Sequence, residues 1–354
     1  MLKIPLKTIY RTLTTYRYRI TMKRALNILK VGGSMALSRV RRQPIVWGTP
    51  LMLMVEPTNI CNLKCPMCPS GAGELTRPAG NLTLDRFKQI IDEVGDGLVL
   101  ILFWNQGEPY LNKNFNQMTA YAKTKNIPVM TSTNGHFLRT MNAVDSVIDS
   151  GLDEIIISMD GVDQESYERY RVGGNFQRVI DGMELLSRRK RERNTARPLI
   201  HLQFLVMKHN QEKINEIKRL AKRIRVDRLS LKSAQIYTKD QGDHFLPDDE
   251  RFRRYEDSEG KYRVKMRSEN WCRVIWYSLT LNWDGTVVPC CFDKDADFIV
   301  GDLAKGEKIK DIWKGEKMQA MRRQILSDRS KIAICANCFE GMSQSYSYFV
   351  ELAE

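Results

Sequence analysis

Three closely spaced cysteines mark the segment Glu56-Pro-Thr-Asn-Ile-Cys61-Asn-Leu-Lys-Cys65-Pro-Met-Cys68, directly after the apolar run 51–55. Structural zinc normally takes four protein ligands, often as paired Cys-x-x-Cys groups, whereas a cubic iron–sulfur cluster is held by thiolates. Three thiolates leave one iron of a [4Fe–4S] cluster without a protein ligand. The segment therefore predicts an iron–sulfur site with one iron open to another molecule.

Apolar runs and helical patterns alternate along residues 50–235. The apolar runs predict strands at 51–55, 98–104, 128–132, 154–159, 201–207 and 227–233. Helical patterns lie between them at 84–94, 114–125, 141–150, 163–191 and 211–224, with Thr83 and Asn210 as expected N-caps. This alternation is typical of parallel strands joined by crossover helices. We expect an α/β fold, a partial (β/α)6 barrel with its site at the carboxyl ends of the strands.

Polar segments follow the first four predicted strands. They are the cysteine loop, Gln106-Gly107-Glu108, Thr133-Asn134-Gly135 and Ser158-Met-Asp160. Each of the three segments other than the cysteine loop would alone fit an ordinary strand end or helix cap. Because the carboxyl ends of parallel strands meet at one edge, the four segments together predict a common site.

This arrangement resembles the radical S-adenosylmethionine (SAM) superfamily over about residues 50–235. In that family the open iron chelates the amine and carboxylate of SAM. An electron from the cluster cleaves SAM to methionine and a 5′-deoxyadenosyl radical, which abstracts a hydrogen from the substrate. The resemblance implies a [4Fe–4S] cluster on Cys61, Cys65 and Cys68, SAM as a cofactor, and a one-electron donor such as flavodoxin or ferredoxin.

The same resemblance implies a SAM pocket. Gly107 and Glu108 match the family's Gly-Gly-Glu motif, with Gln106 in place of the first glycine, and Glu108 would meet the SAM amine. Ser158 and Asp160 would lie near the ribose and carboxylate of SAM, and Arg171 would pair with that carboxylate. The other residues implied are Asn134 and, against the adenine, Met67, Val206 and Met207.

A second group of cysteines begins at Cys272. It continues with Cys290, Cys335 and Cys338, and Asp284-Gly285 predicts a hairpin between 278–282 and 286–288. A helical pattern covers 308–326. The cysteine pattern resembles the twitch form of the SPASM module, a small α+β domain that follows a radical SAM core and carries one auxiliary [4Fe–4S] cluster on four cysteines.

Cys291 is the fifth cysteine of this region. Adjacent residues in a strand point to opposite faces, so we expect Cys290 rather than Cys291 to bind the cluster. Four thiolates are also a structural zinc set, and zinc stays an alternative for this site. The cysteines form short groups in a 354-residue chain, which indicates metal sites in a reducing, cytoplasmic compartment rather than disulfides.

The N-terminal arm, residues 1–49, is basic and amphipathic. The first 50 residues contain eleven Lys or Arg and no Asp or Glu, whereas the net charge of the whole chain is +14. Leu6, Ile9, Leu13, Tyr16 and Ile20 have helical spacing, which Gly32-Gly33-Ser34 is expected to end. Residues 1–30 are therefore a candidate for contact with an anionic membrane surface, for docking to a partner, or for packing on the chain itself.

The remaining boundaries follow from composition. Residues 236–270 are irregular and highly charged and predict a linker. Residues 271–354 then form the auxiliary-cluster domain and the C-terminal tail.

The sequence thus predicts a radical SAM oxidoreductase. Its auxiliary cluster would take one electron from the substrate radical, and Asp293 or Asp284 would take a proton. Tyr237 and Arg273 are candidate substrate contacts. A small polar substrate, such as a sugar or aminocyclitol that is oxidised or epimerised, is favoured over a peptide or protein side chain, because the 50-residue arm is too short for a leader-binding domain.

One alternative is not an enzyme. Two cysteine–zinc modules with a basic tail could bind nucleic acid through its phosphates. This alternative does not explain the three-cysteine loop, the Gly-Glu motif or the strand–helix alternation, so we expect no specific nucleic-acid partner.

Overall fold

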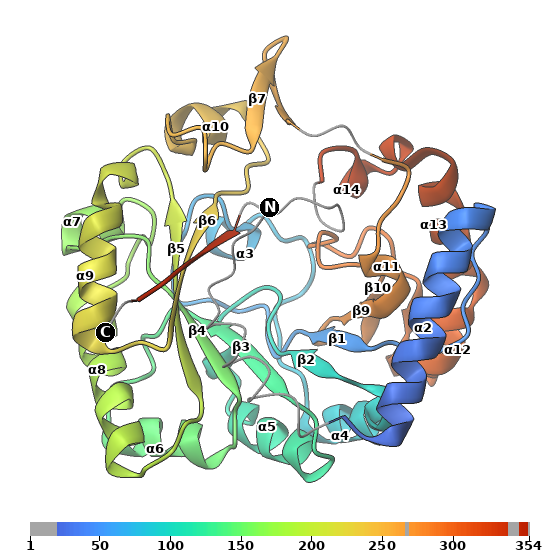
Figure 1. Ribbon diagram of the computed structural model, residues 1–354, viewed down its shortest axis with the longest axis horizontal. Coiled ribbons are helices and arrows are strands. Elements are labelled where there is room, and N and C mark those ends of the chain that lie inside the picture. Colours follow the sequence, from blue (N-terminus) through green and yellow to red (C-terminus); the bar gives the residue numbers. More distant parts are fainter. Residues whose placement is uncertain (1–19, 266–268, 339–346, 353–354) are drawn as a thin grey trace.

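The computed structural model describes residues 20–265, 269–338 and 347–352. Its centre is a ten-stranded sheet with the order β11-β10-β9-β1-β2-β3-β4-β5-β6-β12 (Figure 1). The six predicted strands are all present and parallel. They are β1 Met52–Val55, β2 Leu100–Leu102, β3 Val129–Thr133, β4 Glu154–Ser158, β5 Leu199–Val206 and β6 Arg228–Ser233.

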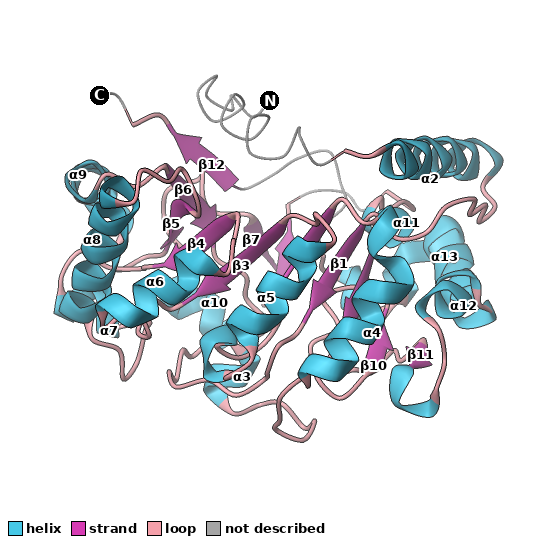
Figure 2. Cartoon of the chain, turned by 90° about the horizontal axis from the view of Figure 1, so that it is seen from below, coloured by secondary structure: helices cyan, strands magenta, loops and turns pink. Residues whose placement is uncertain are grey.

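Helices between these strands cover the outer face of the sheet (Figure 2), which confirms the partial barrel. They are α4 Leu84–Val94, α5 Phe115–Thr124, α6 Met141–Asp149, α7 Gln164–Glu168, α8 Phe176–Glu192 and α9 Ile214–Ile224. The single helix predicted over 163–191 is instead α7 and α8, because Gly173 takes a φ of +79° between them.

Of the two predicted helix N-caps, Thr83 is confirmed as a side-chain cap and Asn210 is not. Thr83 caps α4, since its side chain accepts a hydrogen bond from the Arg86 amide. Asn210 caps no helix with its side chain. It accepts from the Met207 amide and donates to the Asp160 carbonyl, and so holds the ends of β4 and β5 together.

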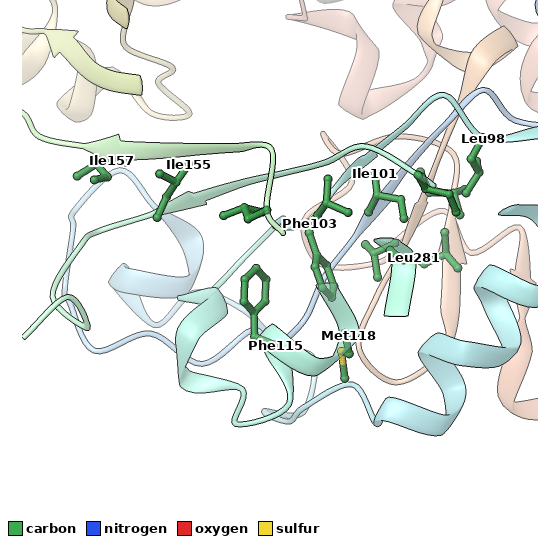
Figure 3. Packing of buried hydrophobic residues seen from close by; sticks show 14 of the residues in the cluster. Leu98, Ile101, Phe103, Phe115, Met118, Ile155, Ile157 and Leu281 are labelled. Carbon is green, nitrogen blue, oxygen red and sulfur yellow. The ribbon is translucent and has the colours of Figure 1, made fainter. Parts of the chain in front are cut away.

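The main core lies between the sheet and these helices (Figure 3). Phe103 follows β2 and stacks on Phe87 and Phe115, with ring centroids 5.0 and 4.8 Å apart. Ile155 and Ile157 of β4 are buried in the same layer. Each such side chain stabilises the fold by roughly 1.5–3 kcal/mol through burial. The opposite side chains of the strands remain available for a site.

The C-terminal domain continues the same sheet. Its first strand, β9 Ser278–Leu281, pairs in parallel with β1, and Val55 lies opposite Leu281. The predicted hairpin is confirmed, because β10 Thr286–Val288 runs antiparallel to β9 and Gly285 has a φ of +101°. The sheet ends in β11 Gly301–Asp302 on this side and in β12 Ser347–Val350, antiparallel to β6, on the other.

Four helices of this domain are described. They are α11 Val274–Tyr277, α12 Ile309–Lys314, α13 Glu316–Asp328 and α14 Ala333–Ala336. The helix predicted over 308–326 is therefore interrupted, at Gly315, which has an extended backbone with ψ 161°.

Residues 236–270, expected to be an irregular linker, contain regular elements. They form α10 Lys239–Phe245 and a hairpin of β7 Tyr255–Ser258 and β8 Lys261–Val264. Leu246 and Tyr255 are buried in a second apolar cluster that also contains Leu63 and Met67 of the cysteine loop. Because the segment is highly charged overall, its sequence pattern did not indicate these few buried side chains.

Residues 20–49, the described part of the N-terminal arm, contain one long helix, α2 Met22–Arg41. It continues through Gly32, Gly33 and Ser34, which were expected to end it. Tertiary contacts outweigh the low helix propensity of glycine here: Ser34 is buried, and a side chain at Gly33 would stand 3.1 Å from the Trp47 ring. Leu6, Ile9, Leu13 and Tyr16 lie outside the described residues. No helix among the described residues has the length and apolarity needed to cross a membrane.

A buried ion pair joins the two domains. Arg77 Nη1 and Nη2 donate to the two Glu56 carboxylate oxygens at 2.9 and 2.8 Å, and the side chains are 5% and 0% exposed. Arg77 Nε also donates to the Lys294 carbonyl, and Glu56 accepts from the Trp283 amide. The pair therefore fixes the C-terminal domain against both ends of the cysteine loop.

Arg77→Met should lower the free energy of unfolding by about 3–5 kcal/mol, because it leaves the Glu56 carboxylate buried without its counter-charge. Chemical denaturation measures the change. Arg169→Met is the matched control: it breaks the exposed Arg169–Glu165 pair and should cost less than about 1 kcal/mol. Equal losses in the two variants would contradict this role for Glu56 and Arg77.

Candidate active site

The three cysteines lie between β1 and the short helix α3 Pro69–Ala72. Cys65 is buried and Cys61 and Cys68 are partly buried, in contact with one apolar cluster. Burial raises the pKa of Cys61 to about 11 and also raises that of Cys65, while Arg171 opposes the shift at Cys65. Thiolates at these positions need a positive partner, and iron ions would provide one.

Gly107 brings the end of β2 against the start of the cysteine loop. Its φ is +73°, and a Cβ atom there would lie 2.5 Å from the Thr58 carbonyl oxygen. Directly after it, the Glu108 amide donates to the Ile60 carbonyl at 2.8 Å. Only glycine fits this close approach, which places Glu108 beside Cys61.

Three hydrogen bonds hold the buried Glu108 carboxylate. It accepts from Thr133 Oγ1 at 2.7 Å, from the Asn134 amide at 2.8 Å and from the Tyr110 amide at 3.2 Å. Burial raises its pKa, and these donors oppose the rise. A carboxylate has about four acceptor positions, so Glu108 can still accept from one further donor.

Asp160 and Arg171 form a buried pair. Arg171 Nε donates to Asp160 Oδ2 at 2.6 Å, and the Leu205 amide donates to Asp160 Oδ1 at 2.7 Å. Arg171 Nη1 lies 3.9 Å from Cys65 Sγ. The structure thus binds Asp160 to the protein through both oxygens, whereas the guanidinium of Arg171 reaches the cysteine loop.

Two of the other predicted strand-end residues contact this loop, and the third, Ser158, contacts the neighbouring strand β3. Asn134 Nδ2 donates to Asn62 Oδ1 at 2.9 Å. Gln106, the residue in place of a glycine, lies with its Oε1 4.0 Å from Cys68 Sγ. Ser158 Oγ lies 3.5 Å from Ser132 Oγ of the neighbouring strand. The polar segments after four strands therefore do converge on one place.

The structure separates the residues expected against the adenine. Met67 and Met207 are buried in the cluster that contacts the cysteines. Val206 instead packs in the main core with Phe204 and Leu202. Side chains alternate along a strand, so Val206 lies on the opposite face of β5 from Leu205. The expectation for Val206 is thus corrected in favour of Met207.

The C-terminal cysteines line one small cavity. Its lining includes Cys272, Cys290, Cys291, Cys335 and Cys338, together with apolar side chains such as Ile275, Met321 and Ile325. Cys290 and Cys291 both reach it because β10 ends at Val288 and the pair lies beyond the strand. Strand alternation therefore does not distinguish Cys290 from Cys291. Thiols in an apolar cavity suit a cluster-binding site.

A larger cavity of about 480 Å³ lies between the two groups of cysteines. It is bordered by Pro69, which follows Cys68, and by Ile334, which also lines the small cavity. Of the two residues predicted to contact substrate, Tyr237 lines this cavity and Arg273 does not. Its charged residues are Glu74, Lys294, Asp295 and Asp297.

The two carboxylates predicted as bases do not line this cavity. Both Asp293 oxygens accept backbone hydrogen bonds of their own loop, from Asp297 at 2.8 Å and Phe298 at 2.9 Å. Asp284 Oδ1 accepts from the amide and hydroxyl of Thr286 in the hairpin turn. Each carboxylate therefore stabilises a turn. In the sequence, the run of charged residues at 293–297 was the signal that could have indicated Lys294, Asp295 and Asp297 as lining residues of the cavity.

Two family models match the chain. The model of the Radical SAM superfamily matches residues 55–224, and that of the SPASM iron–sulfur cluster-binding domain matches residues 272–339. The chain belongs to the radical SAM superfamily. As a radical SAM enzyme it binds a [4Fe–4S] cluster and SAM, and its SPASM domain binds further iron–sulfur. Iron–sulfur therefore replaces zinc at the second site.

Relatives of this radical SAM enzyme match about half of it. The AdoMet-dependent heme synthase of Methanosarcina barkeri is 32% identical over 49% of this chain and 48% of its own length. The PqqA peptide cyclase of Bradyrhizobium diazoefficiens is 26% identical over 57% of this chain and 51% of its own. The chain thus spans about half the length of the curated relatives it matches.

A solved structure shares the fold over more of the chain. The structure of Streptococcus suis SuiB bound to S-adenosylmethionine has a TM-score of 0.61 and 16% identity, and covers 96% of this chain and 78% of its own. At this identity the likeness establishes the fold alone.

Gly107→Ala should weaken SAM binding about tenfold or more, because the added Cβ meets the Thr58 carbonyl and displaces Glu108. Equilibrium dialysis of the anaerobically purified protein measures the affinity. Gly306→Ala is the control: it has a similar φ, +83°, but open space around the new Cβ. It should cost roughly 1–2 kcal/mol of stability and leave the affinity for SAM unchanged. An unchanged affinity of Gly107→Ala for SAM would contradict the role of this close approach in positioning Glu108.

Proposed function

We propose that this radical SAM enzyme is an oxidoreductase that acts on a small polar substrate held between its two clusters. The observation that supports this most is the 480 Å³ cavity between the two groups of cysteines. This volume is typical of a small-molecule site. We assign the first cluster to Cys61, Cys65 and Cys68, and the auxiliary cluster to Cys272, Cys290, Cys335 and Cys338, with Cys291, which lines the same cavity, as the alternative to Cys290.

The bound groups would supply the radical chemistry: reductive cleavage of SAM at the first site, and a one-electron acceptor at the second. The chain's own residues would orient SAM. Glu108 offers a carboxylate to the amine, Arg171 a cation to the carboxylate, and Met67 and Met207 an apolar surface to the adenine. Asn134 and Ser158 complete the pocket. A flavodoxin or ferredoxin in a reducing cytoplasm would donate the starting electron.

The cavity lining favours a substrate that both donates and accepts hydrogen bonds. Lys294 provides a cation, and Glu74 and Asp297 provide carboxylates. Leu75 and Phe298 form an apolar part of the lining. Burial raises the pKa of Tyr237, so its hydroxyl stays a donor. Hydroxyl or amine groups of a sugar-like molecule match this lining.

Proton removal would fall to a carboxylate of the lining. Asp295 is already engaged, since it accepts hydrogen bonds from Thr76 and from the Arg77 amide. Glu74 and Asp297 therefore replace Asp293 and Asp284 as the candidate bases.

A peptide substrate is the second candidate. It is favoured by the similarity to the PqqA peptide cyclase and to the mycofactocin maturase MftC of Mycolicibacterium smegmatis, which is 29% identical over 51% of this chain. The neighbouring genes distinguish the two classes: sugar-modifying enzymes support the small molecule, and a precursor-peptide gene supports the maturase.

Cys335→Ala should abolish substrate turnover but retain SAM cleavage, because it removes a ligand of the auxiliary cluster alone. Cys61→Ala is the counterpart and should abolish SAM cleavage. Chromatographic measurement of 5′-deoxyadenosine in the presence of dithionite reports cleavage in both. Normal substrate turnover by Cys335→Ala would refute the electron-accepting role of the second site, and full cleavage by Cys61→Ala would refute the assignment of the first.

A further inference from the structure

Helix α2 packs on the molecule with a mostly polar face, in which Val31 is the one fully buried apolar side chain among the described residues. Arg24, Asn27, Ser34 and Ser38 are all buried, at 8% exposure or less. Met22, Leu29 and Val40 are instead 76%, 70% and 80% exposed. This is the reverse of a helix that stabilises its domain by burying apolar surface.

The exposed apolar residues form a continuous stripe. Small or apolar side chains occupy the exposed positions 22, 26, 29, 33, 36 and 40, at alternating spacings of four and three. Residues at these spacings lie on one face of a helix. Figure 2 shows α2 at the outer rim of the molecule, beyond α11.

Specific hydrogen bonds fix this orientation. Arg24 donates to the carbonyls of Lys125 and Asn126 at 2.9 and 2.7 Å. Asn27 Nδ2 donates to the Thr49 carbonyl at 3.1 Å and its Oδ1 accepts from the Thr49 amide at 2.9 Å. Arg24 and Asn27 are thus hydrogen-bonded to the backbone of the barrel. These bonds keep α2 from rotating its apolar stripe toward the protein.

Basic residues accompany the stripe. Lys30 and Arg41 are exposed on α2, whereas the other two exposed cations of the helix, Lys23 and Arg39, pair with Asp96 and Glu269. Trp47, just beyond the helix, is 51% exposed. An apolar stripe with lysine, arginine and tryptophan beside it matches an anionic lipid surface, where apolar groups enter the interface and cations meet the headgroups.

We propose that α2 binds this enzyme to the surface of an anionic membrane through Met22, Leu26, Leu29 and Val40. The first half of α2 contacts the amino ends of β1, β2 and β3, near Thr49, Gly97 and Asn126. Its second half contacts the C-terminal domain, where Ser38 accepts a hydrogen bond from Trp276 of α11. The substrate cavity lies beyond the carboxyl ends of the strands, next to Pro69. The membrane-bound enzyme would therefore keep its cavity directed away from the lipid.

Cosedimentation of the cluster-loaded full chain with vesicles tests the proposal. Vesicles with 30% phosphatidylglycerol in phosphatidylcholine should bind the enzyme, about tenfold or more above pure phosphatidylcholine, and added salt should weaken the binding. Leu26→Gln with Leu29→Gln should reduce binding at least ~10-fold. Lys30→Gln with Arg41→Gln should reduce it roughly 30-fold, at about 1 kcal/mol for each lost cation.

Met141→Gln is the matched control, an exposed apolar residue at the start of α6. It should bind vesicles like the wild type, and all variants should retain the wild-type melting temperature and SAM cleavage. Absence of binding to anionic vesicles overturns the proposal, as does binding that the Leu26→Gln, Leu29→Gln variant preserves. A wild-type dimer that the same variant dissociates, without vesicle binding, would show a protein interface instead.

Discussion

The buried pair of Glu56 and Arg77 determines how the two halves of this enzyme face each other. Glu56 directly follows β1 and precedes the cysteine loop, and Arg77 follows the loop. Through the Lys294 carbonyl, Arg77 also reaches the segment after Cys290 and Cys291. Since β9 pairs with β1, the segments that carry the two groups of cysteines are attached to neighbouring strands of one sheet.

The proposed SAM pocket depends on a second constraint, the close approach at Gly107. Parallel strands bring their carboxyl ends to one edge, but they do not by themselves bring Glu108 against the loop before Cys61. Because Gly107 has no side chain, the two segments can make that contact. The hydrogen bond from the Glu108 amide to the Ile60 carbonyl then stabilises it. The hydrogen bonds from Thr133 and Asn134 extend the same arrangement to β3.

Much of this could be predicted from local sequence patterns. Six strands and the convergence of their polar ends follow from periodicity and from the rule for parallel sheets. The continuation of the sheet by β9 could not be predicted, because pairing between residues 52–55 and 278–281 leaves no local signal. Asp293 was misjudged for a related reason: its sequence position near the cysteines is informative, but its hydrogen bonds to Asp297 and Phe298 depend on the folded loop. Val206 was predicted to lie against the adenine, but it lies on the face of β5 that packs in the main core.

The central claim is that one chain holds two cubic clusters, one at each end of the cavity. Iron, sulfide and zinc analysis of protein purified without oxygen tests it most directly. Two [4Fe–4S] clusters predict about eight irons and about eight sulfides per chain. About four irons with zinc at the second site, or zinc without iron, would contradict the account.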